Sequence, residues 1–412
     1  MKIAIITGKD PSFENDTDGA SVLVRNVAIG FSKHGYSVDV YTHKGYSGHT
    51  YLSSKALLQE RLDGAISPDS NGINIYRFPV QQITLSTTPN LGSNFLNRIA
   101  VSYAESDFFK DKKLYDYDVI QIIHMAHSFG LIHNDFAPLS KLVIFPMMLG
   151  AFYRTFLSVP EEYVALEKLI LSEAKHVQTP SQAEMEVLRN SYEVPDSKLF
   201  VVNRGFNPDA FKPRLRTKLP SEKPISVICA NMIRPQKGQM ILVDIVKEAQ
   251  QRGLFVNVHI AGVDGNSYNS HYNGYAAEFH NKIRMDGLGC HFEFHGVLSQ
   301  EELNNLMANS DLAIYPSVTE TFGKSSLESV VTGLPTILFD DVLAFKEYVS
   351  DRVTGFLVPR SPDTVVDLLE ELQSNRRLYS SVSKNGIEIA PRFTWEKIIN
   401  DLLLNYKQRG LL

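Results

Sequence analysis

The stretch Tyr315-Pro-Ser-Val-Thr-Glu-Thr-Phe-Gly-Lys-Ser-Ser-Leu-Glu328 decides the fold of this chain. The mainly apolar residues 311–314 before it are typical of a buried strand, and residues 326–331 at its end are typical of a helix. Between them, Pro316 and Gly323 break both patterns. We therefore expect a strand, a loop and a helix N-terminus, which is where open α/β sheets bind ligands.

Two carboxylates lie eight positions apart in this stretch, Glu320 in the predicted loop and Glu328 on the predicted helix. Eight helical steps would rise about 12 Å, and a loop makes the separation adjustable. The backbone amides of residues 322–325 lie between the two acids at a helix start, where amides suit hydroxyl or phosphate oxygens. A nucleotide sugar needs polar contacts at two such remote points. The alternative is that Glu320 is a surface loop residue and Glu328 belongs to a solvated helix face.

The order of residues 320–328, followed by Gly333-Leu334-Pro335, resembles the Glu-x7-Glu signature of retaining nucleotide-sugar glycosyltransferases of family 4. The resemblance implies an α/β chain of the GT-B fold, with two Rossmann-like domains facing each other across a cleft. It also implies that Glu320 is catalytic and orients the donor sugar, and that Glu328 holds the ribose. The donor site implied by the signature includes Thr321, Phe322, Gly323 and Lys324.

The N-terminal half begins as a Rossmann-like domain does, with a strand at residues 3–7, a helix from Gly19 to Lys33 and a strand at residues 37–42. Asp18 is the expected N-cap of this helix. In the family that this chain resembles, two adjacent glycines in this loop approach the donor phosphate or the acceptor. Gly19 is the matching residue here, and Ala20 takes the place of the second glycine.

A strand is predicted at residues 118–124, with His124 as its last residue and His127 in the loop that follows. Family members often carry His-x-His here, with one histidine near the donor sugar, whereas this chain has His-x-x-His. The resemblance implies a catalytic role for His127, with His124 in the donor site. The alternative is that both are loop or core histidines with satisfied hydrogen bonds. We expect no metal at this pair, because no carboxylate or cysteine lies at ligand spacing.

Two cations follow a strand predicted at residues 225–230, Arg234 and Lys237, in the loop before a helix from Met240 to Arg252. A diphosphate leaving group gains negative charge as the glycosidic bond breaks, and protein cations must balance it where no metal does. The family pattern has arginine five residues before the lysine; Met232 stands there in this chain. The alternative is that both cations are ordinary surface charges.

Further along, residues 290–297 are predicted to form a strand, and the family position matching Val297 offers backbone groups to the nucleobase. We expect three parts in the chain. Residues 1–205 form an acceptor-side Rossmann-like domain and residues 206–390 a nucleotide-sugar-binding one. Residues 391–412 hold a C-terminal helix that is expected to cross back to the first domain, anchored by Trp395.

Composition narrows the classes of function. The chain has 412 residues with a net charge of −5, so no basic field favours a nucleic-acid partner. Its two cysteines give neither a disulfide framework nor a metal quartet, which favours a reducing cytoplasm. The N-terminal apolar run is too short for a signal peptide, and no stretch has the length of a membrane span. Residues 95–113 mix basic and aromatic side chains, but acids dilute the basic face, so we expect a packed helix and no membrane association.

The sequence therefore predicts a retaining hexosyltransferase of carbohydrate biosynthesis. It is expected to move a sugar from a nucleoside-diphosphate sugar, a UDP-sugar by family frequency, to a hydroxyl of a small-molecule or glycan acceptor, without metal or other cofactor. Two alternatives stay open, a nucleotide-sugar epimerase of similar architecture and a binding protein that has lost turnover. The residues leave the donor sugar, its base, the acceptor, the linkage and the oligomeric state open.

Overall fold

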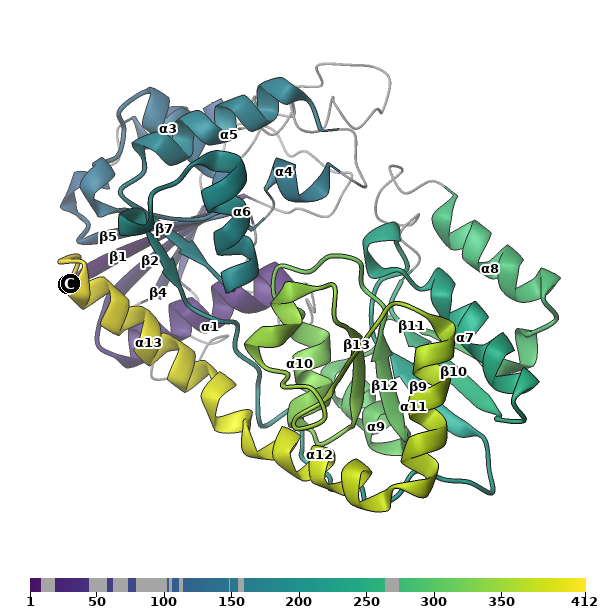
Figure 1. Ribbon diagram of the computed structural model, residues 1–412. Helices are drawn as coiled ribbons and strands as arrows, with labels where there is room; N and C mark the ends of the chain where they lie inside the picture. Colours follow the sequence, from purple (N-terminus) through teal and green to yellow (C-terminus); the bar gives the residue numbers. More distant parts are fainter. Residues whose placement is uncertain are drawn as a thin grey trace. The chain divides into compact units, whose positions relative to one another are not determined.

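The computed structural model describes residues 1–8, 19–43, 58–61, 73–78, 102–103, 106–110, 114–147, 149–154, 159–263 and 274–412. The predicted cap at Asp18 and most of the predicted helix at residues 95–113 lie outside these ranges. The chain divides into two compact units (Figure 1). The N-terminal unit comprises Met1–Arg204 and Trp395–Leu412, and the C-terminal unit comprises Gly205–Thr394.

The N-terminal unit is built on an eight-stranded sheet in the order β3-β4-β2-β1-β5-β6-β7-β8. Among the strand pairs that the structure describes in this sheet, only β3–β4 is antiparallel. Strands β1 and β5 are almost wholly buried, as expected of parallel strands covered on both faces. The strands are β1 Lys2–Thr7, β2 Ser37–His43, β3 Leu58–Arg61, β4 Ile73–Phe78, β5 Val119–Ile123, β6 Leu142–Phe145, β7 His176–Thr179 and β8 Leu199–Val201.

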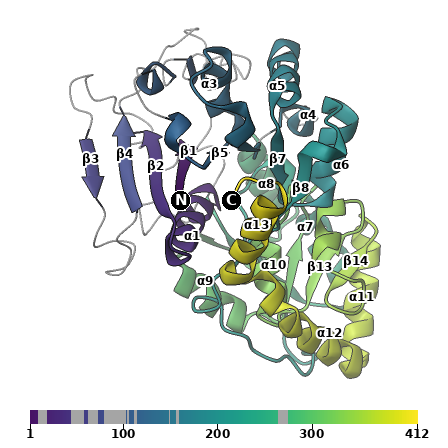
Figure 2. The ribbon, with the colours of Figure 1, turned by 90° about the vertical axis from the view of Figure 1, so that its left-hand side faces the viewer.

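The first and last helices of the chain, α1 and α13, pack against each other in this unit (Figure 2). A Cβ placed on Gly30 would lie 2.4 Å from Cγ1 of Ile399, so only glycine lets the two helices approach this closely. Phe31 of α1 and Tyr406 of α13 share one buried apolar core with strands β1 and β2. The helices are α1 Gly19–Lys33, α3 Phe129–His133, α4 Gly150–Tyr153, α5 Glu161–Glu173, α6 Gln182–Tyr192 and α13 Trp395–Gln408.

The C-terminal unit is built on a six-stranded, all-parallel sheet in the order β11-β10-β9-β12-β13-β14. The strands are β9 Ile225–Cys229, β10 Val256–Ala261, β11 Phe292–Gly296, β12 Leu312–Tyr315, β13 Thr336–Phe339 and β14 Phe356–Val358. The helices are α7 Met240–Gln251, α8 Tyr275–Met285, α9 Gln300–Asn309, α10 Lys324–Val331, α11 Pro362–Ser374 and α12 Arg376–Glu388. The first strand of the unit, β9, lies between β10 and β12, so the strand order reverses there. This is the Rossmann order, and its reversal is a topological switch point.

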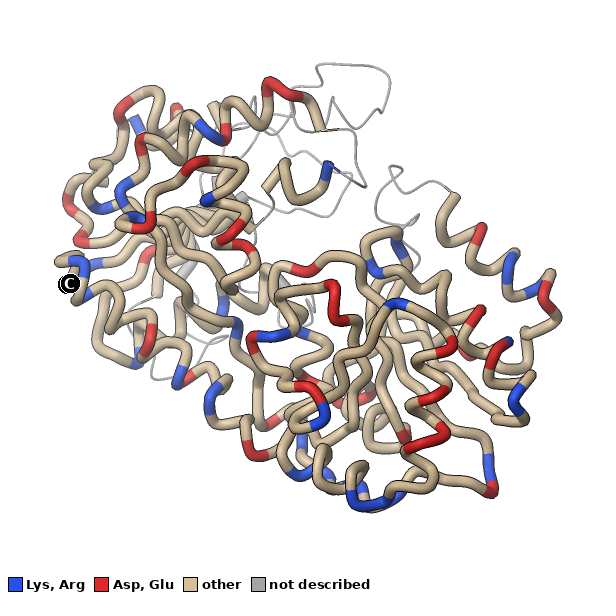
Figure 3. The backbone as a smooth tube through the Cα atoms, viewed as in Figure 1, with Lys and Arg blue, Asp and Glu red and all other residues tan. Residues whose placement is uncertain are grey.

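The predicted α/β class with two Rossmann-like sheets is confirmed. The predicted strand, loop and helix around Glu320 are present as β12, a loop and α10, although α10 begins at Lys324 rather than Ser326. Lysines and arginines are interspersed with acids along the described backbone of both units (Figure 3). Among the helices that the structure describes, none combines the length and the apolar character that crossing a membrane requires.

Candidate functional site

Two loops of the C-terminal unit meet at its switch point. One follows β9 and carries Lys237, and the other follows β12 and carries Glu320. The amide of Val318 donates a hydrogen bond to the carbonyl oxygen of Gln236 at 2.9 Å, which ties the loops together. Gly238 makes this contact possible, because its φ is +64° and a Cβ there would lie 2.2 Å from the Pro316 carbonyl oxygen.

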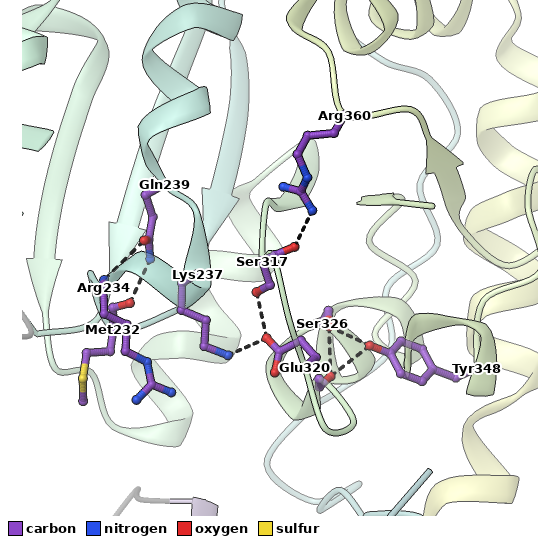
Figure 4. A network of polar contacts seen from close by, with 10 residues as sticks. Met232, Arg234, Lys237, Gln239, Ser317, Glu320, Ser326, Tyr348 and Arg360 are labelled. Atoms are coloured by element: carbon purple, nitrogen blue, oxygen red, sulfur yellow. Dashed lines mark hydrogen bonds and ion pairs between the residues drawn. The ribbon is translucent and has the colours of Figure 1, made fainter. Parts of the chain in front are cut away.

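Lys237 and Glu320 form an ion pair at this junction, so the structure joins two residues that were predicted separately (Figure 4). Their side chains are only 13% and 12% exposed, which rules out the alternative that they are ordinary surface charges. The hydroxyl of Ser317 donates to the same carboxylate oxygen of Glu320 at 2.7 Å. Burial lowers the pKa of the Lys237 ammonium, and the charge of Glu320 opposes that shift.

Arg360 is a site residue that the sequence analysis did not identify. Its guanidinium donates to the carbonyl oxygens of Pro316 at 2.8 Å and of Ser317 at 2.7 Å, and so holds the Glu320 loop from the far side (Figure 4). It also forms a two-pronged ion pair with Asp341, at 2.7 and 2.8 Å, and lies 4.3 Å from the ring centroid of Phe339. These contacts occupy the guanidinium, so it has no pair of N–H groups left to bind a ligand. We therefore regard Arg360 as a residue that supports the loop.

Gly323 is the N-cap residue of α10. Its φ is +89°, and it provides no capping side chain. The Tyr348 hydroxyl lies 2.7 Å from Oγ of Ser326 and 3.0 Å from the Gly323 carbonyl oxygen, and a Cβ on Gly323 would clash with it at 2.6 Å. The side chain of Phe322 is buried against Tyr348, with ring centroids 5.4 Å apart, so only its backbone can meet a ligand. The amides of the first helical turn have no partners within the helix and therefore suit an anion.

Glu328 lies one turn further along α10 and is ion-paired with Lys324. It is only 2% exposed, so the alternative of a solvated helix face is wrong. Burial raises the pKa of the Glu328 carboxyl, and the neighbouring ammonium of Lys324 opposes that shift. A buried carboxylate with a single cationic partner keeps lone pairs for hydroxyl donors.

The remaining residues of the predicted donor site lie in the loops after β9, β11 and β12 of the same unit. The buried side-chain amide of Gln239 donates a hydrogen bond to the Met232 carbonyl oxygen at 2.8 Å and so stabilises the loop that carries Arg234. The Nε of Arg234 is buried and has no hydrogen-bond partner among the described residues. Val297 directly follows β11 and is 59% exposed, and Thr321 lies in the loop before α10.

The other predicted residues belong to the N-terminal unit and follow β1 and β5 of its sheet. Gly19 is the first residue of α1, followed by Ala20. His124 has a φ of +80°, a conformation that is strained for a residue with a Cβ and that recurs at functional sites. Its Nδ1 accepts a hydrogen bond from the Ala126 amide at 3.3 Å, and its ring centroid lies 5.7 Å from that of His127. The strain draws attention to His124, whereas the sequence analysis preferred His127.

Comparison with known proteins identifies this arrangement. Residues 17–210 match the family "Glycosyltransferase Family 4", and residues 211–389 match "Glycosyl transferases group 1". D-inositol 3-phosphate glycosyltransferase of Jonesia denitrificans is 24% identical over 264 residues, a match that spans 60% of this chain and 60% of that relative.

Solved structures show the same fold. Sucrose-phosphate synthase of Thermosynechococcus elongatus is 21% identical with a TM-score of 0.76, and the match covers 99% of this chain and 98% of that one. Anabaena HepE in complex with UDP and glucose is 17% identical with a TM-score of 0.68, and the match covers 99% and 100%. The two family matches together span nearly the whole chain, and the two Rossmann-like sheets agree with them. The chain belongs to the family 4 glycosyltransferases, which have the GT-B fold.

Proposed function

We propose that this glycosyltransferase moves a hexose, with retention of anomeric configuration, from a nucleoside-diphosphate sugar to a hydroxyl of a small-molecule or glycan acceptor. The observation that carries the proposal is the buried ion pair of Lys237 and Glu320 at the switch point of the C-terminal sheet. It lies in the loops that precede α7 and α10, so a cation, a carboxylate and helix amides converge on one sheet edge.

Each group has a role that its surroundings support. Lys237 and the first amides of α10 stabilise the negative charge of the diphosphate. Glu320 orients the sugar and stabilises the positive charge that develops at the anomeric carbon. Glu328 accepts hydrogen bonds from the ribose hydroxyls, and the adjacent Lys324 favours its ionised form despite burial. Arg234, whose buried Nε has no partner among the described residues, is a further donor for the phosphates.

The proposed transfer is a front-face displacement. The acceptor oxygen bonds to the anomeric carbon on the face that the diphosphate leaves, and the bond from that carbon to the phosphate oxygen breaks. The acceptor proton passes to the departing phosphate oxygen. We propose that no metal or other cofactor takes part, because Lys237 and the helix amides supply the positive charge that the leaving group needs. The roles of Gly19, His124 and His127 stay predictions from the family resemblance.

A UDP-sugar is the donor that we propose, since HepE, a protein of the same fold, binds UDP and glucose. The backbone at the exposed Val297 is the proposed contact for the base. We also propose a cytoplasmic location, because Cys229 and Cys290 are both free thiols. The N-terminal unit is the proposed acceptor side and the C-terminal unit the proposed donor side.

The test compares donor binding and turnover in matched variants. The wild type, Lys237→Met, Glu328→Gln and Glu388→Gln are screened for thermal stabilisation and slow hydrolysis with UDP-, GDP- and ADP-sugars in the presence of EDTA. Glu388→Gln is the control, because it also breaks a lysine–glutamate pair one helical turn apart, but on the exposed surface of α12. We expect one donor class to stabilise the wild type and the control but not Glu328→Gln. Lys237→Met should lower turnover by roughly 100-fold or more.

The same screen separates the alternatives. Conversion of the donor to an epimer with no acceptor present would favour an epimerase, and donor binding without any product would favour a degenerate binding protein. The anomeric configuration of the product, read by proton NMR, tests retention. If no nucleotide sugar stabilises the wild type, the assignment of Glu320 and Glu328 to a donor site is wrong.

A further inference from the structure

Three potential metal ligands meet at the β11 edge of the C-terminal sheet, away from the ion pair of Lys237 and Glu320. His259 lies on β10, and Glu293 and His295 lie on the edge strand β11. His259 pairs in register with Glu293, and residues two apart on a strand point to the same face. The register then shifts, because Ile260 pairs with Phe294 and Ala261 with Gly296, so His295 is the extra residue of a bulge. A bulge re-aims its side chain, and here the imidazole of His295 points to that of His259.

The polar atoms of the three side chains lie close enough together to share one cation. Nδ1 of His259 lies 3.1 Å from Nε2 of His295 and 3.2 Å from Oε2 of Glu293. Nε2 of His295 lies 3.8 Å from Oε1 of the same carboxylate. Zinc bonds to nitrogen and oxygen at about 2.0–2.2 Å, so adjacent ligands of a tetrahedral site lie roughly 3.3–3.6 Å apart. The two separations from Nδ1 of His259 are slightly shorter than those of such a site, so small side-chain shifts would place the three groups around one ion.

We propose that His259, Glu293 and His295 bind a divalent cation of the zinc class, with the fourth position taken by water. Two imidazoles and one carboxylate are a ligand set that zinc uses when it keeps an open position. The histidine side chains are 20% exposed and that of Glu293 is 65% exposed, which gives the ion a path from solvent.

The cluster lies on two neighbouring strands, so the proposed ion would have a structural role. Among the strands that the structure describes, β11 is hydrogen-bonded to β10 alone, so it is the edge strand of this sheet. A cation held by His259 on one strand and by Glu293 and His295 on the other would cross-link the two strands. No step of the proposed sugar transfer uses these residues. The proposal of a metal site is therefore tested independently of that reaction.

Metal binding is tested on the full chain after treatment with EDTA and removal of the chelator. Zn²⁺ affinity is measured by competition with a chromophoric chelator, and Co²⁺ reports the ligand geometry by its visible spectrum. The variants are His259→Asn, His295→Asn and Glu293→Gln. The control is His291→Asn, because the His291 imidazole lies beside the same strands but bonds to the Val256 carbonyl oxygen at 3.0 Å.

We expect the wild type and the His291→Asn control to bind one equivalent of Zn²⁺ with equal affinity and to give a tetrahedral Co²⁺ spectrum. Each ligand variant should bind at least about tenfold more weakly. Glu293→Gln alters an exposed side chain and should keep its fold, so a Zn²⁺-dependent rise in the unfolding midpoint that the wild type shows and Glu293→Gln lacks is a second readout. Equal affinity in all four variants, or no Zn²⁺ binding by the wild type at micromolar concentration, would overturn the proposal.

Discussion

Gly238→Ala is the substitution that most directly separates the local packing of the site from its charges. Gly238 has a φ of +64°, and the Cβ of alanine would lie 2.2 Å from the carbonyl oxygen of Pro316. Real Cβ atoms essentially never approach another heavy atom closer than 3.0 Å, so the two loops must move apart by about 0.8 Å. Pro316 begins the loop that carries Glu320, and Lys237 directly precedes Gly238. The change therefore separates the ion pair without removing either charge.

The expected cost has two parts. Placing a residue with a Cβ at positive φ lowers the free energy of unfolding by roughly 1–2 kcal/mol. Forcing an extra carbon into a packed contact lowers it by about 1–3 kcal/mol more. Gly253→Ala measures the first part alone, because Gly253 has a φ of +79° but no atom within 4 Å of the added Cβ. We therefore expect Gly253→Ala to lower the free energy of unfolding by about 1–2 kcal/mol, and Gly238→Ala by about 2–5 kcal/mol.

The assay combines chemical unfolding with donor binding for both variants and the wild type. Gly253→Ala should keep wild-type donor affinity and turnover, whereas Gly238→Ala should lose turnover by a factor of ten or more, since small displacements of catalytic groups are costly. If Gly238→Ala matches Gly253→Ala in both stability and turnover, the two loops are not held together by the close approach of Gly238 to Pro316. The reasoning from packing to catalysis would then be refuted.

Three further substitutions test the surroundings of the site and one buried acid. Arg360→Lys keeps the charge but loses the fork that spans Asp341 and two carbonyl groups, so we expect a loss of about 1–3 kcal/mol in unfolding free energy and weaker donor binding by thermal shift. Tyr348→Phe removes the hydroxyl beside Gly323 and should cost about 1–2 kcal/mol, measured by urea unfolding. Burial raises the pKa of Glu184 from 4.5 to about 8. Its contribution to stability is therefore complete below pH 4.5 and is lost as the pH rises to about 8, and Glu184→Gln should flatten the pH dependence of the unfolding midpoint over that window.

Short apolar runs bounded by turn residues were sufficient to predict strands of both sheets, such as β1 and β9, but not β3, whose residues 58–61 are mostly polar. The strand and helix that flank Glu320 were identified in type from the sequence. The start of α10 was predicted two residues late, because the apolar pattern begins at Ser326 while the helix begins after the left-handed Gly323. A pattern of apolar spacing does not report a backbone conformation that only glycine adopts without strain.

The parts of the site that the sequence analysis missed depend on contacts between distant residues. Arg360 bonds to a carbonyl group 44 positions away, and nothing in its own neighbourhood indicates that contact. The ligand cluster around His259 joins two strands through a bulge, whereas a metal motif is read from short spacings along one segment. Asp341, the ion-pair partner of Arg360, is likewise distant from it in the sequence, 19 positions before it.

The direct contact between Lys237 and Glu320 also explains why the proposed reaction suits this site. In a glycosyl transfer, negative charge develops on the leaving oxygen and positive charge on the anomeric carbon, and these two atoms are joined by the breaking bond. A catalyst complementary to that transition state needs a cation and an anion side by side, already oriented and shielded from water. Each charge alone would be costly to bury, and the charge of Glu320 opposes the lowering of the Lys237 pKa that burial causes. The same pairing that makes the charges tolerable when buried is thus the arrangement of cation and anion that the proposed reaction would use.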